Sequence, residues 1–215
     1  RRIIWKGVRI MAITYPLSVP STGRFIQFSL TAQNAVAYSQ SPFTFAGQAH
    51  AYSGQMWQLD ATLRPMRRSE AEPWIAFLTA LRGQVGTFLI GDSLGCRSRG
   101  LASSFLGTPV ITNQSGGTIS VTGASTSKTG WLLAGDYIQI GTGASATLHK
   151  VLQDANTDAS GDVTLEIWPH IRGTRSGAIA ASDTVGNFRL SGNSITRPSD
   201  SQGIYSISFS AMEAV

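Results

Sequence analysis

Charged residues are scarce in this chain of 215 residues. Asp, Glu, Lys and Arg make up 13% of the sequence, whereas about 25% is usual for a soluble globular domain. Small polar residues take their place. A polar but weakly charged surface is typical of subunits that pack against one another, and a secreted β-protein with a Ser/Thr-rich surface is the alternative.

Cysteine and long apolar runs are also nearly absent. Cys96 is alone, so no intrachain disulfide can form. No apolar run approaches the roughly 20 residues that a membrane helix needs, and we expect no membrane insertion. Stability must therefore come from apolar cores, and the chain is long enough for one large β-domain or two smaller ones.

Acidic residues are missing from the start of the chain, before Asp60. The basic residues there account for the whole net charge of +5, and they are Arg1, Arg2, Lys6, Arg9 and Arg24. No basic stripe interleaved with aromatic residues is present, which argues against a nucleic-acid groove. The first ten residues lack the apolar run and cleavage site of a signal peptide. Two origins stay open for residues 1–10: residues upstream of a natural start at Met11, or a basic arm that lies against another subunit.

One stretch, from Ser69 to Asp92, carries the only convincing helix signal. Ser69 and Glu72 have the spacing of a capping box, and Pro73 restricts the helix start to Glu70 or Pro73 itself. Gly83 suits a C-terminal cap. The spacing i, i+3, i+4, i+7 predicts an apolar stripe that packs against a sheet, formed by Trp74, Phe77, Leu78 and Leu81.

The rest of the chain has the alternation of β-strands. In the first region, strands are predicted at Arg24–Ala32, Trp57–Leu63 and Thr87–Ile90, with a loop between the first two. Short strand candidates separated by Gly, Ser and Asn turns follow at Pro109–Thr112, Thr118–Thr122, Tyr137–Ile140, Thr147–Leu152 and Val163–Trp168. Gly203–Ser210 alternates like the first region and can complete its sheet. We therefore predict a mainly β protein: a β-sandwich with one packed helix (11–95 and 192–215), an inserted small β-barrel or sandwich (96–191) and an N-terminal arm (1–10).

Several motifs resemble ligand sites only superficially. Asp154–Asp162 has oxygen side chains spaced as in a calcium loop but lacks the glycine and the bidentate Glu, so a hairpin turn is favoured. Gly123–Thr129 and Gly141–Ala146 lack the helix that a phosphate or dinucleotide loop requires. We interpret both as turns and predict no cofactor.

No catalytic or metal constellation is evident. His50, His149 and His170 are scattered without metal-ligand spacing, and no Gly-x-Ser-x-Gly motif is present. Asp136 and Glu166 are the least implausible carboxylate pair. Because no site converges, we predict that the protein is not an enzyme.

Aromatic residues are the remaining functional signal. Trp131 and Trp168 of the middle region are candidate contacts for a glycan or a protein partner, and Phe43 and Phe45 lie in a predicted loop. Burial in a β core is the more frequent fate of such residues.

Four consecutive segments resemble a known family. They are Ser41–Thr44 (SPFT), Gly54–Met66 (GQMWQLDATLRPM), Ser69–Leu78 (SEAEPWIAFL) and Leu81–Asp92 (LRGQVGTFLIGD). Together they resemble the distal tail proteins of phages with long, non-contractile tails, a group that includes the lambda-type minor tail protein M. Trp131–Ile140 (WLLAGDYIQI) and Glu166–Arg172 (EIWPHIR) resemble such phage proteins more loosely.

The resemblance implies a tail-tube-like β-sandwich flanked by a helix. It implies a ring, six-fold in the family, at the virion tail tip, which joins the tail tube protein to the tail hub protein and leaves its lumen open for passing DNA. An outward-facing insertion that binds host-surface sugar is a second role found in the family. We expect the basic arm to contact an acidic neighbour in such a ring, through Arg1, Arg2, Lys6 and Arg9.

Overall fold

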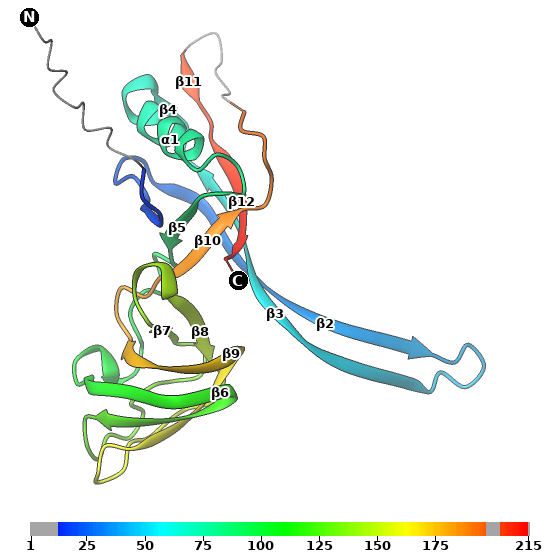
Figure 1. Ribbon diagram of the computed structural model, residues 1–215, viewed down its shortest axis with the longest axis vertical. Coiled ribbons are helices and arrows are strands. Elements are labelled where there is room, and N and C mark those ends of the chain that lie inside the picture. Colours follow the sequence, from blue (N-terminus) through cyan, green and yellow to red (C-terminus); the bar gives the residue numbers. More distant parts are fainter. Residues whose placement is uncertain (1–12, 197–202, 215) are drawn as a thin grey trace, which may run out of the picture.

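The computed structural model describes residues 13–196 and 203–214. The protein is mainly β with one α-helix, as predicted, and the strands of the described residues form several sheets and no closed barrel (Figure 1). The largest sheet has six strands in the order β1 (Leu17–Ser18), β5 (Thr87–Ile90), β10 (Gly186–Leu190), β12 (Ser208–Glu213), β3 (Gly47–Leu63) and β2 (Phe25–Gln40). A two-stranded sheet pairs β4 (Met66–Arg67) with β11 (Ile204–Tyr205).

The middle of the chain forms a four-stranded sheet of its own. Its order is β6 (Gly107–Ala124), β9 (Val163–Ala180), β7 (Tyr137–Ile140) and β8 (Thr147–Val151), with an additional β8–β9 pairing. Two short 3₁₀ helices, η1 (Leu101–Ser103) and η2 (Gly143–Ser145), lie in the connections. Strand β6 unites two of the predicted strands, since the ladder with β9 continues across residues 113–117 through register shifts. Each irregularity bends the strand, and the polar, glycine-rich sequence there concealed its continuity.

Helix α1 (Arg68–Ala80) packs its apolar stripe into the core of the six-stranded sheet. None of the four side chains in this stripe is more than 7% exposed. They are Trp74, Phe77, Leu78 and Leu81. At about 1.5–3 kcal/mol for each large side chain, their burial contributes on the order of 6–12 kcal/mol of gross transfer free energy.

The predicted start of this helix is wrong. The N-cap is Arg67, and no side chain makes a capping hydrogen bond. The helix begins directly after strand β4, which already fixes the chain's entry, and the carboxylate of Glu72 accepts a hydrogen bond from Arg68 Nε at 3.1 Å. Pro73 therefore lies inside the helix. At the other end the C-cap is Leu81, and both Arg82 and Gly83 have positive φ, so the left-handed turn begins one residue earlier than expected.

Strand β10 corrects one predicted boundary. Residues 186–190 were assigned to the insertion, but β10 pairs with β5 and β12 in the six-stranded sheet. Phe188 and Leu190 are buried beside Phe88 in the core of that sheet. The chain therefore returns to the six-stranded sheet close to Gly186 rather than at residue 192, because β10 supplies apolar residues to the core of that sheet.

Candidate functional site

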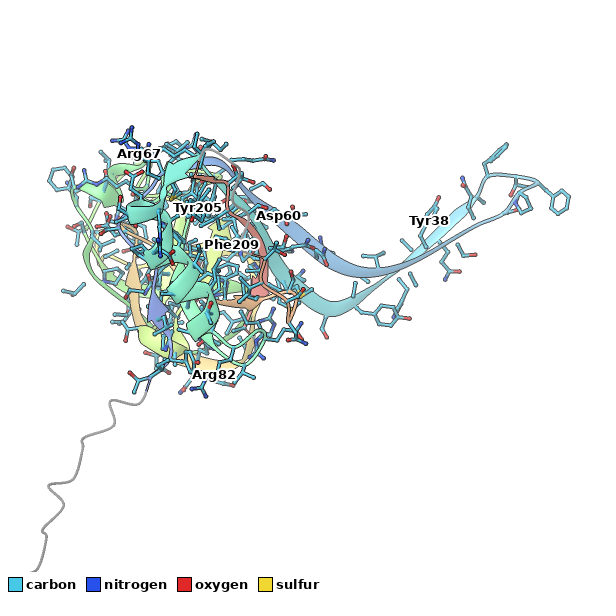
Figure 2. The ribbon with its side chains drawn as sticks, turned by 90° about the horizontal axis from the view of Figure 1, so that it is seen from above. Tyr38, Asp60, Arg67, Arg82, Tyr205 and Phe209 are labelled. Atoms are coloured by element: carbon cyan, nitrogen blue, oxygen red, sulfur yellow. The ribbon has the colours of Figure 1, made fainter. Side chains whose placement is uncertain are left out.

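A long hairpin projects from the molecule. Strands β2 and β3 pair from Phe25 and Leu63, inside the sheet, out to Gln40 and Gly47, and their outer half extends well beyond the rest of the chain (Figure 1). We call residues 35–54 the arm, which is distinct from the predicted N-terminal arm of residues 1–10. Figure 2 shows Tyr38 far out on the arm and away from Asp60 on the body of the molecule. The sequence predicted a loop containing Ser41–Ala46 between two shorter strands; Ser41–Ala46 is a turn, but the residues on either side of it are strand rather than loop.

The arm carries apolar side chains with no core to bury them. Phe43 and Phe45 at its tip are 91% and 74% exposed, and further exposed apolar residues on its strands are Val36, Tyr38 and Tyr52. An isolated two-stranded hairpin is marginally stable at best in water. This hairpin therefore exposes aromatic and aliphatic side chains that its own two strands do not cover.

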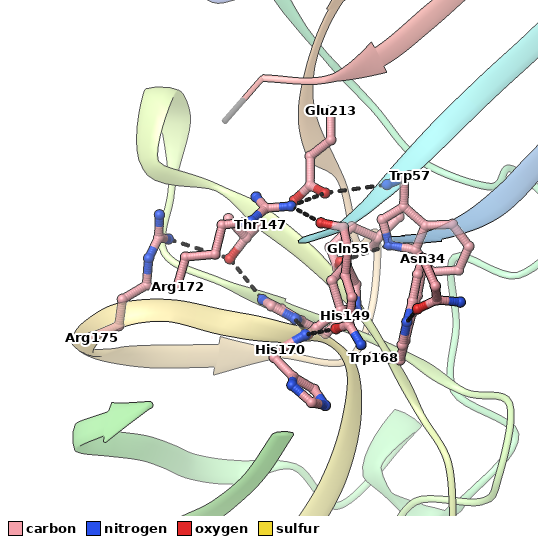
Figure 3. A network of polar contacts seen from close by, with 12 residues as sticks. Asn34, Gln55, Trp57, Thr147, His149, Trp168, His170, Arg172, Arg175 and Glu213 are labelled. Carbon is pink, nitrogen blue, oxygen red and sulfur yellow. Dashed lines mark hydrogen bonds and ion pairs between the residues drawn. The ribbon is translucent and has the colours of Figure 1, made fainter. Parts of the chain in front are cut away.

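The root of the arm is held by strand β9 of the four-stranded sheet (Figure 3). Trp168 Nε1 donates to Asn34 Oδ1 at 2.8 Å, and the His170 backbone N–H donates to Gln55 Oε1 at 2.8 Å. The Arg172 guanidinium donates to the backbone carbonyl of Gln55. Alternate residues of a strand point to the same side, so the side chains of Trp168 and Arg172 both reach the hairpin, and the backbone N–H of His170 between them adds a third contact.

Further contacts of Glu213 and Trp57 tie this region to the core. The buried carboxylate of Glu213 accepts hydrogen bonds from the Trp57 backbone N–H and from Arg172, both at 3.3 Å. The rings of Trp57 and Trp168 meet edge to face with centroids 4.5 Å apart, and Trp57 Nε1 donates to the carbonyl of Leu148 at 2.9 Å. Both sheets therefore meet at the root of the arm.

His149 lies at the same junction and is 3% exposed. Its Nδ1 is 2.7 Å from the carbonyl of Pro169, so Nδ1 carries the proton, and Nε2 accepts from the Thr147 hydroxyl at 2.9 Å. The Arg175 guanidinium donates to Thr147 Oγ1 at 3.3 Å. Burial, together with the nearby charges of Arg175 and Arg172, lowers the pKa of His149 from 6.5 to about 4, although the Pro169 hydrogen bond opposes this shift. His149 is neutral at physiological pH and completes a continuous hydrogen-bonded chain.

The two tryptophans proposed as ligand contacts occupy different environments. Trp131 is 0% exposed, and its Nε1 donates to the Phe105 carbonyl at 3.0 Å, so it is a core residue and its proposed surface role is wrong. Trp168 is half-buried and contacts Trp57 and Asn34. Its partner in this structure is the arm root of the same chain.

The basic residues of the predicted N-terminal arm, Arg1, Arg2, Lys6 and Arg9, lie outside the described residues. Their proposed contact with an acidic neighbour stays a prediction. In residues 13–196 and 203–214, no helix has the length and apolar character needed to cross a membrane.

The oxygen-rich segment from Asp154 to Asp162 joins β8 to β9 and uses its side chains for the backbone. Asp154 accepts from the Ala134 N–H at 2.8 Å, and Asp158 accepts from the N–H groups of Ser160 and Asp162, both at 2.8 Å. Those hydrogen bonds lower the pKa of Asp158. Nowhere in the described part of the chain do three or more His, Cys, Asp or Glu residues form a group that could hold a metal ion.

The two carboxylates considered for catalysis have structural contacts. Asp136 is buried and accepts from the backbone N–H groups of Arg99, Gly100 and Leu133 at 3.0–3.2 Å, and also from Arg99 Nε at 3.2 Å. Glu166 accepts from the Thr118 hydroxyl at 2.6 Å. This arrangement fixes the loop that precedes β7 and gives Asp136 no exposed oxygen for a substrate.

Comparison with protein-family models gives no match, and comparison with curated proteins gives none either. The function proposed below therefore rests mainly on the geometry of the chain. Its most informative part, the arm, was missed at the sequence level. The sequence signal that could have revealed it is a pair of similar runs on either side of Ser41-Pro-Phe-Thr-Phe-Ala. In the first of these runs, Val36 and Tyr38 alternate with alanine and serine.

Proposed function

We propose that this protein is a structural subunit of a phage tail tip, where copies of the chain form a ring that connects the tail tube to the tail hub. The arm carries this proposal. It has no partner within the described chain that covers Phe43 and Phe45, and its two strands project clear of the sheet. Burial of these two rings on a neighbour would contribute about 3–6 kcal/mol per contact before the costs of association.

A ring follows from the asymmetry of such a contact. The arm of one copy and the body of the next are different surfaces, so the contact is heterologous and repeats head to tail until the ring closes. The resemblance of residues 41–92 to distal tail proteins supports this arrangement and suggests six copies. The low content of charged residues, 13%, is compatible with extensive surface between subunits.

One face of the six-stranded sheet supports the lumen side of the proposal. In β3 and β12 the residues that alternate with the core residues are partly or fully exposed, and they are Gln58, Asp60, Thr62, Ser208, Ser210 and Met212. Asp60 is the only charged residue in this set, and Ser210 donates to it at 2.5 Å. Arg189 of β10 pairs with Met212 and lies on the same face, so Asp60 and Arg189 contribute opposite charges there. A face with so little net charge would let DNA pass with little binding.

We propose a structural and not a catalytic role. The alternative, in which the middle sheet binds host glycan, depended on Trp131 and Trp168, and the first is buried while the second contacts the arm root. We therefore do not propose glycan binding for this chain.

The test is the assembly state of the purified full chain, measured by mass photometry and by negative-stain imaging. We expect ring-shaped particles of several copies, and we expect the Phe43→Ser/Phe45→Ser double variant to remain monomeric. Leu94→Ser is the matched control, since Leu94 is 97% exposed on the body. A wild-type chain that stays monomeric at every accessible concentration, with no ring in virions, refutes the proposal. Rings formed by the double variant refute the role of the arm.

A further inference from the structure

The pairing of β2 with β3 is interrupted at one place. The ladder runs without a shift from Gln27 and Thr62 to Asn34 and Gln55, and it resumes with Val36 opposite Ala51. At the interruption, Ala35 of β2 therefore lies opposite residues 52–54 of β3. Extra residues on one strand disrupt the ladder and bend the hairpin locally. This bulge separates the arm from the body of the molecule.

Strand β9 holds the last regular pair before the bulge. Asn34 accepts from Trp168 Nε1, and Gln55 accepts from the His170 backbone N–H and from Arg172. Beyond this pair, the hydrogen bonds and ring contacts of the described residues 35–54 are with one another, as in the Ser41–Ala46 turn and the His50–Tyr52 ring contact. The chain is thus fixed on one side of the bulge and supported only by itself on the other.

We propose that β9 clamps the root of the arm, that the arm pivots at the bulge, and that the middle segment of the chain thereby sets the direction in which the arm points. The clamp consists of Asn34, Gln55, Trp168, His170 and Arg172. Six residues separate Asn34 from Gln40, which at about 3.3 Å per residue places the end of the strand roughly 20 Å from the pivot. A rotation of about 20° at the bulge then displaces that end by roughly 7 Å, which is enough to move an aromatic side chain out of a binding pocket.

The clamp also connects the arm to the rest of the middle segment. Strand β9 pairs with β6, β7 and β8, so it belongs to every pairing of the four-stranded sheet except that between β7 and β8. A displacement of this sheet by a bound partner would be transmitted to the arm root through the same three positions of β9. This coupling is a property of the single chain and goes beyond the proposed ring.

The test measures the spread of arm positions directly. Spin labels are attached at Ser39→Cys on the arm and Ala76→Cys on the exposed side of α1, in a Cys96→Ser background, and distances are measured by pulsed electron paramagnetic resonance. Labelled chain is diluted with unlabelled chain so that distances between copies do not contribute. We expect one narrow distance distribution for the clamped chain and at least a two-fold broader one for the Asn34→Ala/Gln55→Ala variant, which removes the side-chain partners of Trp168 and His170 and leaves only the Arg172 contact with the backbone carbonyl of residue 55.

A matched control is available further into the sheet. Gln33 Nε2 donates to Gln58 Oε1 across the same two strands, and neither side chain hydrogen-bonds to β9. The Gln33→Ala/Gln58→Ala variant should keep the narrow distribution. The single Gln55→Ala variant keeps the Asn34–Trp168 hydrogen bond and should give an intermediate width, which preserves the test if the double variant folds poorly.

Two results overturn the inference: a clamp variant as narrow as the control, or a starting chain already as broad as the clamp variant. The measurement does not require assembly, so a chain that forms no ring can still show the clamp. Equally, rings can form from a chain whose arm direction does not depend on β9.

Discussion

His149 makes the stability of the protein depend on pH in a direction that the structure determines. The folded chain holds this imidazole neutral, with a pKa lowered from 6.5 to about 4 by burial and by two nearby arginines. The unfolded chain binds the proton more readily. The free energy of unfolding therefore receives the full contribution of the group above about pH 6.5 and loses it progressively as the pH falls toward 4.

The size of this effect follows from the shift. A pKa change of about 2.5 units corresponds to about 3.4 kcal/mol when the transition is complete. Between about pH 7 and about pH 4.5, the part expected from His149 is about 2.4 kcal/mol. We expect a His149→Gln variant to be less stable at neutral pH, because the chain from Arg175 through Thr147 to Pro169 is disturbed, but to lose less stability on acidification.

The assay is urea unfolding of both proteins at several pH values in this range, followed by circular dichroism. Carboxyl groups also titrate in this range, but they are present in both proteins. The difference between the two pH profiles therefore isolates the contribution of His149. His170→Gln is the control, since it removes an exposed imidazole near the same junction. Parallel profiles for His149→Gln and the wild-type chain would refute the reasoning, because they would mean that the buried imidazole takes up its proton without penalty.

Three further predictions test the fold. Both carboxylate oxygens of Asp136 accept N–H groups, so Asp136→Asn turns one acceptor into a donor and should cost about 2–4 kcal/mol of unfolding free energy. Asp154→Asn keeps an amide oxygen for its single Ala134 N–H and should cost less than half as much; equal losses in urea unfolding would contradict this. Gly91→Ala should lower the melting temperature by several degrees, since a Cβ would collide with the carbonyl of Thr184, and an unchanged melting temperature would show that the backbone yields. Trp131→Ala should cost about 3–5 kcal/mol as a core truncation, and a variant that unfolds like the wild type would show that this ring is not part of the core.

The sequence predicted those parts of the fold that depend on local apolar patterning. The stripe of Trp74 and Leu81 and the alternation from Trp57 to Leu63 both place apolar residues against a core, and both features are present. The cap of α1 was mispredicted because strand β4, only two residues long, determines how the chain enters the helix. Such a strand exists only through its pairing with β11, distant in the sequence.

The candidate site was harder to predict because its strands do not bury a face. Residues 35–54 are exposed on both sides, so the apolar alternation that reveals a half-buried strand is weak there. Likewise, no local pattern could bring Asn34 to Trp168, since that contact spans 134 residues of sequence. The sequence could not show that His149 is buried and neutral, because the residues that determine its pKa, such as Pro169 and Arg175, lie on β9.

The position of β12 has a consequence for synthesis of the protein. Among the strands of residues 13–196 and 203–214 it comes last in chain order, yet it lies between β10 and β3 in the middle of the six-stranded sheet. Until residues 208–213 leave the ribosome, the β2–β3 hairpin cannot join the strands β1, β5 and β10 through the backbone. The four-stranded sheet is built from β6 to β9, which follow one another in the sequence, so it can form earlier. A nascent chain therefore carries a divided sheet with two open edges until β12 emerges, and the arrival of this strand joins the two parts of the six-stranded sheet.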